Sequence, residues 1–251
     1  MEVHQHTHTP RKKWTHYFWE FLMLFLAVTL GFFVENQREH FIENKREREY
    51  IRSLIIDLKK DTAHALLHLR RNIQRFHGLD SLEDLLSREG PIDSATTFHL
   101  YDLSTKYTRN ISKAITNEIT IQQLLSSGNV RLLRRRGVYD SLVLYQVRKQ
   151  LLFNGEAVYE EMGRRVALLN EDIFKMRGYR EIIMKSDTTF PRSYKTINLQ
   201  LMTTDRTKLI KYAQVVETFR ATVSSYVATL NTVKNSATNL LIFLENEYHL
   251  D

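Results

Sequence analysis

Four side chains that can ligate a metal ion follow one another along a short stretch of the chain. Asp57, Asp61, His64 and His68 are spaced 4, 3 and 4 residues apart, and on a helix this spacing places them along one stripe. Two histidines four residues apart chelate zinc or another divalent ion when a neighbouring helix supplies a third ligand. We expect this stripe to be a polar flank of hydrogen-bonded acids and histidines, and keep a metal site as the alternative. The sequence holds no H-E-x-x-H motif, and we expect no cofactor besides such an ion.

A second candidate site is the stretch LLSSGNVRLLRRR at residues 124–136. Its four arginines are Arg131, Arg134, Arg135 and Arg136. A phosphate-binding loop of the P-loop type needs several glycines and ends in G-K-[ST], whereas this stretch has one glycine and no such ending. Gly128 instead predicts a residue in the left-handed conformation that ends one helix before the next begins. The stretch is therefore predicted to be a corner between two helices.

The arginines of this corner would lie near the start of a helix, where the helix dipole disfavours cations. Their predicted partner is the acidic end of the last helix, with Glu245, Glu247 and Asp251. Each exposed ion pair of this kind typically stabilises the fold by under ~1 kcal/mol. The alternative is the anionic surface of a membrane, worth about 1 kcal/mol for each basic residue close to it. We expect the intramolecular pairing and keep lipid or partner contact as the alternative.

The elements that must position these residues begin with a strongly apolar segment. Residues 17–34 are interrupted only by Glu20, and 18 helical residues at about 1.5 Å each span most of the roughly 30 Å hydrocarbon core of a bilayer. Trp14, Tyr17 and Trp19 form an aromatic belt at its start. No small-x-small cleavage pattern follows, so residues 14–35 are predicted to be an uncleaved transmembrane anchor. Glu20 is expected at headgroup depth, where it can contact lipid or another helix.

The charges that flank the anchor predict its orientation. Three basic residues, 11–13, precede it, whereas the stretch after it mixes acids with bases. By the positive-inside rule, residues 1–13 form a cytoplasmic basic and histidine-containing tail, and residues 36–251 lie in the periplasm. The chain is therefore predicted to be a single-pass protein of a bacterial inner membrane.

The rest of the chain is predicted to be all-α. Only 8 glycines and 3 prolines occur in 251 residues, which favours long uninterrupted helices. We predict that the anchor continues into an elongated up-down-up-down bundle with helices at about 36–88, 94–127, 137–177 and 204–249. The last helix carries a coiled-coil-like seam. Its two interleaved rows are Leu209, Val216, Val223, Leu230, Ala237 and Leu244, and Tyr212, Phe219, Tyr226, Val233 and Leu240.

Smaller features refine this bundle. Gly90 and Pro91 are expected to stop the first helix, and the second is expected to break near Asn110. Apolar side chains from Tyr159 to Met176 are predicted to share one face of the third helix. The stretches REIIM, residues 180–184, and KTINLQLM, residues 195–202, read as short strands, and Thr203 or Thr204 is predicted to cap the last helix.

The stretches LLSSGNVRLLRRRGVYDSLVLYQ and WEFLMLFLAVTLGFFVENQRE followed by REREYIRSLIIDLKKDT resemble motifs of a family of uncharacterised membrane-anchored proteins of Bacteroidetes. That family combines a Glu-led apolar anchor, a charged stalk with an EYLxxLxxDLxxDT helix, and an L-x-S-S-G-N-L-R-L-I-R-N corner. The matching positions are Glu20, Tyr50, Leu54, Asp57, Asp61, Ser126, Ser127, Gly128, Asn129, Arg131, Leu132 and Arg134. The resemblance covers residues up to about 147. It implies the anchored helical architecture, and the family has no assigned activity.

Composition narrows the function classes. The chain has no cysteine, which excludes disulfides, thiolate metal sites and a cysteine nucleophile, and it has no G-x-S-x-G motif. A formal net charge of +7 indicates an anionic neighbour, and the anchor favours phospholipid over nucleic acid. We predict a non-enzymatic scaffold, sensor or interaction module at the cell envelope. Its expected partners are membrane lipid through residues 14–35, an unidentified protein and a second copy of itself; the alternative is a metal- or ligand-binding bundle built on the stripe from Asp57 to His68.

Overall fold

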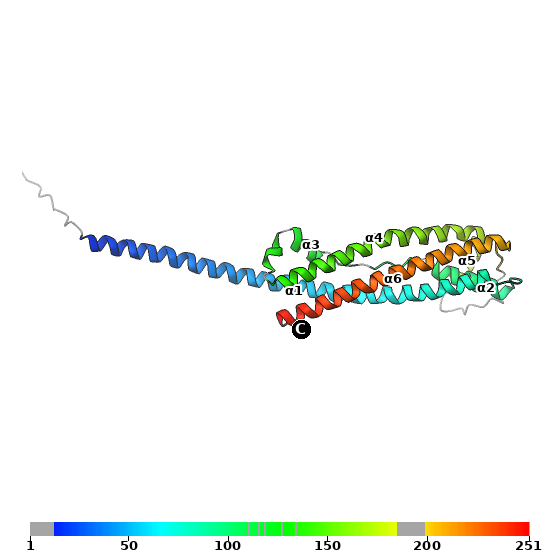
Figure 1. The fold of residues 1–251 in the computed structure, drawn as a ribbon, viewed down its shortest axis with the longest axis horizontal. Helices are drawn as coiled ribbons and strands as arrows, with labels where there is room; N and C mark the ends of the chain where they lie inside the picture. The colour runs from blue at the N-terminus through cyan, green and yellow to red at the C-terminus, as the bar shows by residue number, and fades with distance from the viewer. Residues whose placement is uncertain are drawn as a thin grey trace, which may run out of the picture. The chain divides into compact units, whose positions relative to one another are not determined.

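A computed structural model describes residues 13–109, 111–114, 116–117, 119–126, 128–133, 135–184 and 199–250, without the side chains of Asn129, Arg136 and Met184. These residues form six α-helices and one short 3-10 helix (Figure 1). Their bounds are α1 Trp14–Ser87, α2 Ser94–Tyr107, α3 Ile119–Ser126, η1 Asn129–Leu132, α4 Arg136–Ile173, α5 Met176–Met184 and α6 Arg206–Tyr248. The chain divides into two compact units, 1–50 and 51–251, and α1 contributes to both.

The first unit contains the apolar part of α1. This part is long and apolar enough to cross a membrane, and none of its most apolar 18-residue window is buried inside the protein. Phe32, for example, leaves 75 % of its surface exposed. A core helix of a globular domain would bury such side chains, so the structure does not support a core-helix assignment for this segment. Length, apolarity and the continuation of the helix past residue 36 are confirmed.

The core of the second unit is built around α6. All eleven seam positions predicted from the seven-residue period, from Leu209 to Leu244, are buried. Helix α4 lies along α6, and Tyr159 of α4 stacks on Tyr226 of α6 with ring centroids 4.4 Å apart. Full burial of each large apolar side chain contributes about 1.5–3 kcal/mol. The coiled-coil-like seam is therefore confirmed as the main packing surface.

The corner after α1 and the break in the second predicted helix both follow the prediction. Helix α1 ends at Ser87, and Gly90 adopts a φ of 112°, which favours glycine. The carboxylate of Asp93 then caps α2 by accepting a hydrogen bond of 2.7 Å from the backbone N–H of Thr96. Helix α2 stops at Tyr107. The helix therefore ends close to the break expected near Asn110, and the chain is helical again in α3, Ile119–Ser126. Because α2 and α3 are short, the described part of the unit contains three long helices instead of the four predicted.

The Ser-Ser-Gly corner is confirmed. Gly128 has a φ of 68° and a ψ of 6°, the left-handed conformation expected of it. The 3-10 helix η1 follows, and Leu132 and Leu133 return to the core. Helix α4 begins at Arg136. This corner thus joins α3 to α4 without any strand before it in the described residues.

The connection between α4 and α6 differs from the prediction. Helix α4 ends at Ile173, before the predicted residue 177, and Phe174 forms an isolated antiparallel bridge with Leu201. The stretch REIIM lies in helix α5, so its prediction as a strand is wrong. Helix α5 buries Tyr179 and Ile182, which are three residues apart and therefore lie on the same face of a helix. Residues 195–198 of the second predicted strand lie outside the described residues.

Two further details of the predicted third and fourth helices are corrected. Met176 belongs to α5 and is exposed, so it does not extend the buried face of α4. The N-cap of α6 is Asp205, whose carboxylate accepts from the backbone N–H of Thr207 at 2.8 Å. An aspartate accepts such bonds at least as well as the predicted threonines Thr203 and Thr204.

Candidate functional site

The stripe that is the candidate metal site contacts α3 and the segment between α2 and α3. Asp57 accepts a hydrogen bond of 2.5 Å from the Thr120 hydroxyl, and the ring of His68 lies 2.9 Å from the Ser112 hydroxyl. His64 is exposed. The described residues contain no group of three or more acidic or histidine side chains placed to hold a metal ion. The structure therefore gives Asp57, Asp61 and His68 protein partners, as a polar flank requires.

Asp61 makes the most contacts of the four. It is 3 % exposed, and its carboxylate accepts from the backbone N–H of Asn117 at 2.7 Å, the side-chain amide of Asn117 at 3.0 Å and the hydroxyl of Tyr145 at 2.8 Å. Burial raises the pKa of Asp61 above its usual value, while these hydrogen bonds and the charge of Lys149 oppose the rise. Asp61 therefore joins α1 and α4 to the non-helical segment.

We call residues 111–117 the strap; its described residues are 111–114 and 116–117. Asn72 donates to the carbonyl of Ser112 at 2.9 Å, at one end, and Asp61 accepts from the N–H of Asn117 at the other. Asn72 and Asp61 are 11 residues apart on α1, a rise of about 16 Å. Five residues of chain reach at most about 17 Å. The contacts of Ser112 and Asn117 therefore hold these two residues about as far apart as the chain allows, and the strap runs antiparallel to α1.

The backbone of the strap is bonded by side chains from three helices. Besides Asp61 and Asn72 of α1, the hydroxyl of Tyr226 in α6 accepts from the N–H of Ala114 at 3.0 Å, and the ammonium of Lys149 in α4 lies 3.3 Å from the carbonyl of Asn117. Buried backbone groups must find such partners when they leave a helix. These side chains explain why the described residues between α2 and α3 leave the helical conformation.

Four ionisable side chains are buried around the strap. Asp61, Arg75, Lys149 and Glu156 are 3 %, 5 %, 1 % and 8 % exposed. Charged residues are rarely buried to this degree unless they are paired. All four lie at positions of α1 or α4 that face the core between apolar residues. The side chains that hold the strap therefore form a polar cluster inside the helical packing.

Arg75 and Tyr159 form the centre of this polar cluster. The guanidinium of Arg75 donates to the carbonyl of Tyr107 at 3.1 Å, to the amide oxygen of Asn72 at 3.0 Å and to the hydroxyl of Tyr159 at 2.5 Å. The Tyr159 hydroxyl in turn donates to Asn72 at 2.6 Å. Burial raises the pKa of Tyr159, so it stays a neutral phenol that can serve as donor and acceptor.

Glu156 and Tyr226 complete the polar cluster on the α4–α6 side. The Tyr226 hydroxyl lies 3.1 Å from the Glu156 carboxylate while it accepts from Ala114. Burial raises the pKa of Glu156, and the hydrogen bond from Tyr226 and the charge of Lys113 oppose the rise. Burial also raises the pKa of Tyr226. The Tyr226 phenol of α6, which the Glu156 carboxylate of α4 positions, therefore holds the N–H of Ala114 in the strap.

The contact between His68 and the strap predicts a pH dependence. Burial lowers the pKa of His68 from 6.5, and the charges of Arg71 and His64 lower it further. The unfolded chain therefore takes up this proton first as the pH falls, and the folded state loses stability. Between about pH 7.5 and 6, His68→Gln is expected to lose less stability than the wild type. Urea denaturation at each pH measures this; equal slopes for the two proteins would contradict it.

The corner arginines are only partly described. Arg135 forms an ion pair with Glu247, and its guanidinium lies 4.7 Å from the centre of the Tyr248 ring. Lys59 and Glu245 pair at 2.8 Å at the same end of the unit. The intramolecular partner is therefore present for Arg135. Arg131 is exposed, and Arg134, the Arg136 side chain and Asp251 lie outside the described residues.

Glu20 is exposed on the apolar part of α1. One of its carboxylate oxygens lies 3.7 Å from the Nδ1 atom of His16, one helical turn earlier. Residues four apart on a helix face each other in this way. The predicted lipid or partner contact of Glu20 therefore stays a prediction, and a local partner exists beside it.

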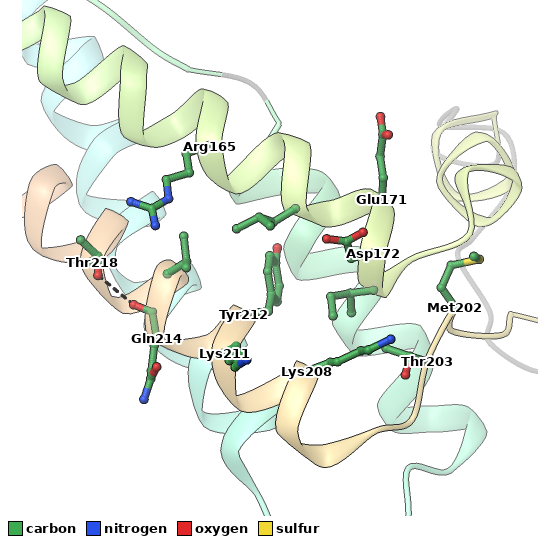
Figure 2. A pocket seen from close by; sticks show the side chains of 13 residues that line it. Arg165, Glu171, Asp172, Met202, Thr203, Lys208, Lys211, Tyr212, Gln214 and Thr218 are labelled. Carbon is green, nitrogen blue, oxygen red and sulfur yellow. Dashed lines mark hydrogen bonds between the residues drawn. The ribbon is translucent and has the colours of Figure 1, made fainter.

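A separate groove of about 880 Å³ lies between the end of α4 and the start of α6. Figure 2 shows Arg165 at one end and Asp172 with Lys208 at the other, and Tyr212 stands between them. Cations and anions both line this groove, and its floor includes the buried Ile173. The mixture does not define an anion or a cation site.

The sequence interpretation missed the part of the polar cluster that α4 and α6 contribute. Tyr145, Lys149, Glu156 and Tyr159 follow the 3-and-4-residue spacing of the buried face of α4. Polar residues in an apolar register were the available signal. No protein-family model, no curated protein and no solved structure matches this chain, so the site stands on its geometry and the resemblance to the Bacteroidetes family stays a prediction.

Proposed function

We propose that this chain is a single-pass, membrane-anchored helical bundle of a bacterial inner membrane that acts as a scaffold, sensor or interaction module and not as an enzyme. One observation carries the proposal. The same helix, α1, holds the unburied apolar stretch and the side chains that bind the strap. Apolar residues all round a helix suit a bilayer, and a one-sided apolar face suits a bundle. A force on the anchor would thus reach the bundle through an unbroken helix.

The charge distribution supports an orientation for this proposal. Three basic residues, 11–13, precede the apolar stretch, and mixed charges follow it. This arrangement favours a cytoplasmic N-terminus and a periplasmic unit 51–251. Membrane lipid would be the partner of residues 14–35. An unidentified protein, or a second copy of the chain, would be the partner of the bundle.

The non-enzymatic part of the proposal is supported by the roles of the buried polar groups. Asp61, Asn72 and Tyr226 bond the backbone of the strap, and the described contacts of Arg75 are to Tyr107, Asn72 and Tyr159. A catalytic group needs access to substrate and a matched partner. These side chains instead join secondary-structure elements.

Extraction from membranes tests the anchor. The wild type is expected to stay in the membrane pellet after alkaline carbonate treatment and to enter solution only with detergent. Leu26→Arg with Leu30→Arg should abolish this behaviour, because each arginine at the centre of a spanning helix costs about 2.5–3.5 kcal/mol. Leu66→Arg with Leu67→Arg is the matched control, since these two leucines are exposed on the same helix within the second unit. Release of the wild type by carbonate would contradict the proposal.

A further inference from the structure

We propose that the cleft between α1, α4 and α6 that holds the strap is a peptide-binding groove occupied by the protein's own chain. Its external ligand would be an extended segment of a partner protein that carries a basic residue. This inference goes beyond the anchoring role and does not depend on it. The strap occupies the groove in the structure and therefore shows how such a peptide would bind.

The first argument is that the groove recognises main chain. It bonds two N–H groups, of Ala114 and Asn117, and two carbonyls, of Ser112 and Asn117, through side chains of the helices. Every peptide presents these groups at the same spacing when it is extended. Main-chain hydrogen bonds supply affinity in other modes of extended-peptide recognition. The groove is therefore suited to a class of segments and not to one sequence alone.

The second argument is that the polar cluster carries a desolvation cost, which a core with only a structural role would avoid. Burial of Asp61, Arg75, Lys149 and Glu156 requires desolvation that apolar side chains of similar volume would avoid. A continuous second helix over an apolar face would have satisfied its own backbone. The chain instead keeps side-chain donors and acceptors for a segment whose backbone N–H and C=O groups are bonded by these side chains. Such an arrangement is what a groove for an exchangeable strand requires.

The third argument concerns the basic residue. Lys113 of the strap forms an ion pair with Glu160 of α4, and the Glu156 carboxylate acts on the same ammonium group. These two carboxylates select a lysine or arginine at this position of the bound segment. The side chain of Lys113 is 44 % exposed, so a partner's basic residue can reach the same carboxylates.

The fourth argument is that the strap fits the groove imperfectly. Within the described part of the chain, the hydroxyl oxygen of Thr116 is buried and has no hydrogen-bond partner. A buried hydroxyl without a partner carries a desolvation penalty. A partner segment with an apolar residue at this position would avoid that penalty. The tethered strap still holds the groove in the free protein, because a linked segment acts at a high effective concentration.

Peptide binding to a variant with a weakened strap tests the proposal. Lys113→Ala with Ala114→Pro removes the ion pair and the N–H that Tyr226 accepts, while every groove side chain stays in place. The probe is a fluorescein-labelled peptide RNISKAITNEI, which repeats residues 109–119, added to the full chain in detergent micelles. We expect saturable binding that is at least about tenfold tighter to this variant than to the wild type. The same peptide with the lysine changed to glutamate should bind at least about tenfold more weakly.

Two outcomes would overturn the proposal. One is a weakened-strap variant that keeps wild-type circular dichroism but binds neither peptide saturably, or binds both equally. The other is dimerisation of this variant that the peptide does not compete, which would assign the groove to a second copy of the chain. If the variant does not fold, hydrogen exchange of the wild type decides. Amides of Ala114 and Asn117 that exchange before global unfolding support an exchangeable strap, and amides that exchange only with global unfolding refute it.

Discussion

Replacement of Asp61 by alanine is expected to lower the free energy of unfolding by about 3–5 kcal/mol, the typical cost of breaking a buried charged network. The substitution leaves the N–H and the side-chain amide of Asn117 and the hydroxyl of Tyr145 without their acceptor. It also removes the carboxylate that faces the buried Lys149. Urea denaturation of the full chain in mild detergent, followed by circular dichroism, measures the change.

Asp57→Ala is the matched control for this prediction. Asp57 lies one turn earlier on the same helix and accepts a described hydrogen bond from Thr120. Its loss is expected to cost about 1 kcal/mol, the ordinary worth of a partly exposed hydrogen bond. Equal losses for the two variants would contradict the assignment of Asp61, and not Asp57, to the buried polar cluster.

The second large effect is expected in the seam of α6. Phe219 is fully buried, and its ring lies 5.8 Å from that of Tyr159. Phe219→Ala leaves a cavity between α4 and α6 and should cost about 3–5 kcal/mol. Phe153→Ala on α4 is the control, because Phe153 is 38 % exposed and its truncation should cost under about 1 kcal/mol. A smaller loss for Phe219 than for Phe153 would show that the seam does not form the core.

Regular spacing made the long helices predictable. The seven-residue period of α6 identified all eleven buried seam positions because one repeated face decides which side chains leave water. The ends of α1 and α3 were also predictable, since Gly90 and Gly128 adopt backbone conformations that few other residues tolerate. Local chemistry and periodicity were sufficient for these elements.

The strap was not predictable from local signals. The sequence predicted only a break near Asn110 within residues 94–127, and no proline interrupts that stretch. The non-helical course depends on Asp61, Asn72, Lys149 and Tyr226, which lie between 32 and 112 residues away from their strap partners along the chain. Long-range hydrogen bonds of this kind override local preference. Of the four stripe residues, these contacts place Asp61 in the polar cluster.

The directions of the helices decide between the two partners predicted for the corner arginines. A run of cations at a helix start suggested either the acidic C-terminal helix end or a lipid surface. Antiparallel packing of α4 on α6 brings Arg135 beside Glu247 and the Tyr248 ring. That partner required only that α4 and α6 are neighbouring long helices that run in opposite directions.

Labelling of single cysteines in intact cells tests the proposed anchoring and orientation most directly. The chain has no native cysteine, so His16→Cys and Leu66→Cys each introduce one thiol, at exposed positions before and after the apolar stretch. With the outer membrane permeabilised, a membrane-impermeant maleimide is expected to label Leu66→Cys at once and His16→Cys only after the inner membrane is broken. Labelling of both thiols in intact cells, or of His16→Cys alone, would contradict a cytoplasmic N-terminus joined by α1 to a periplasmic bundle.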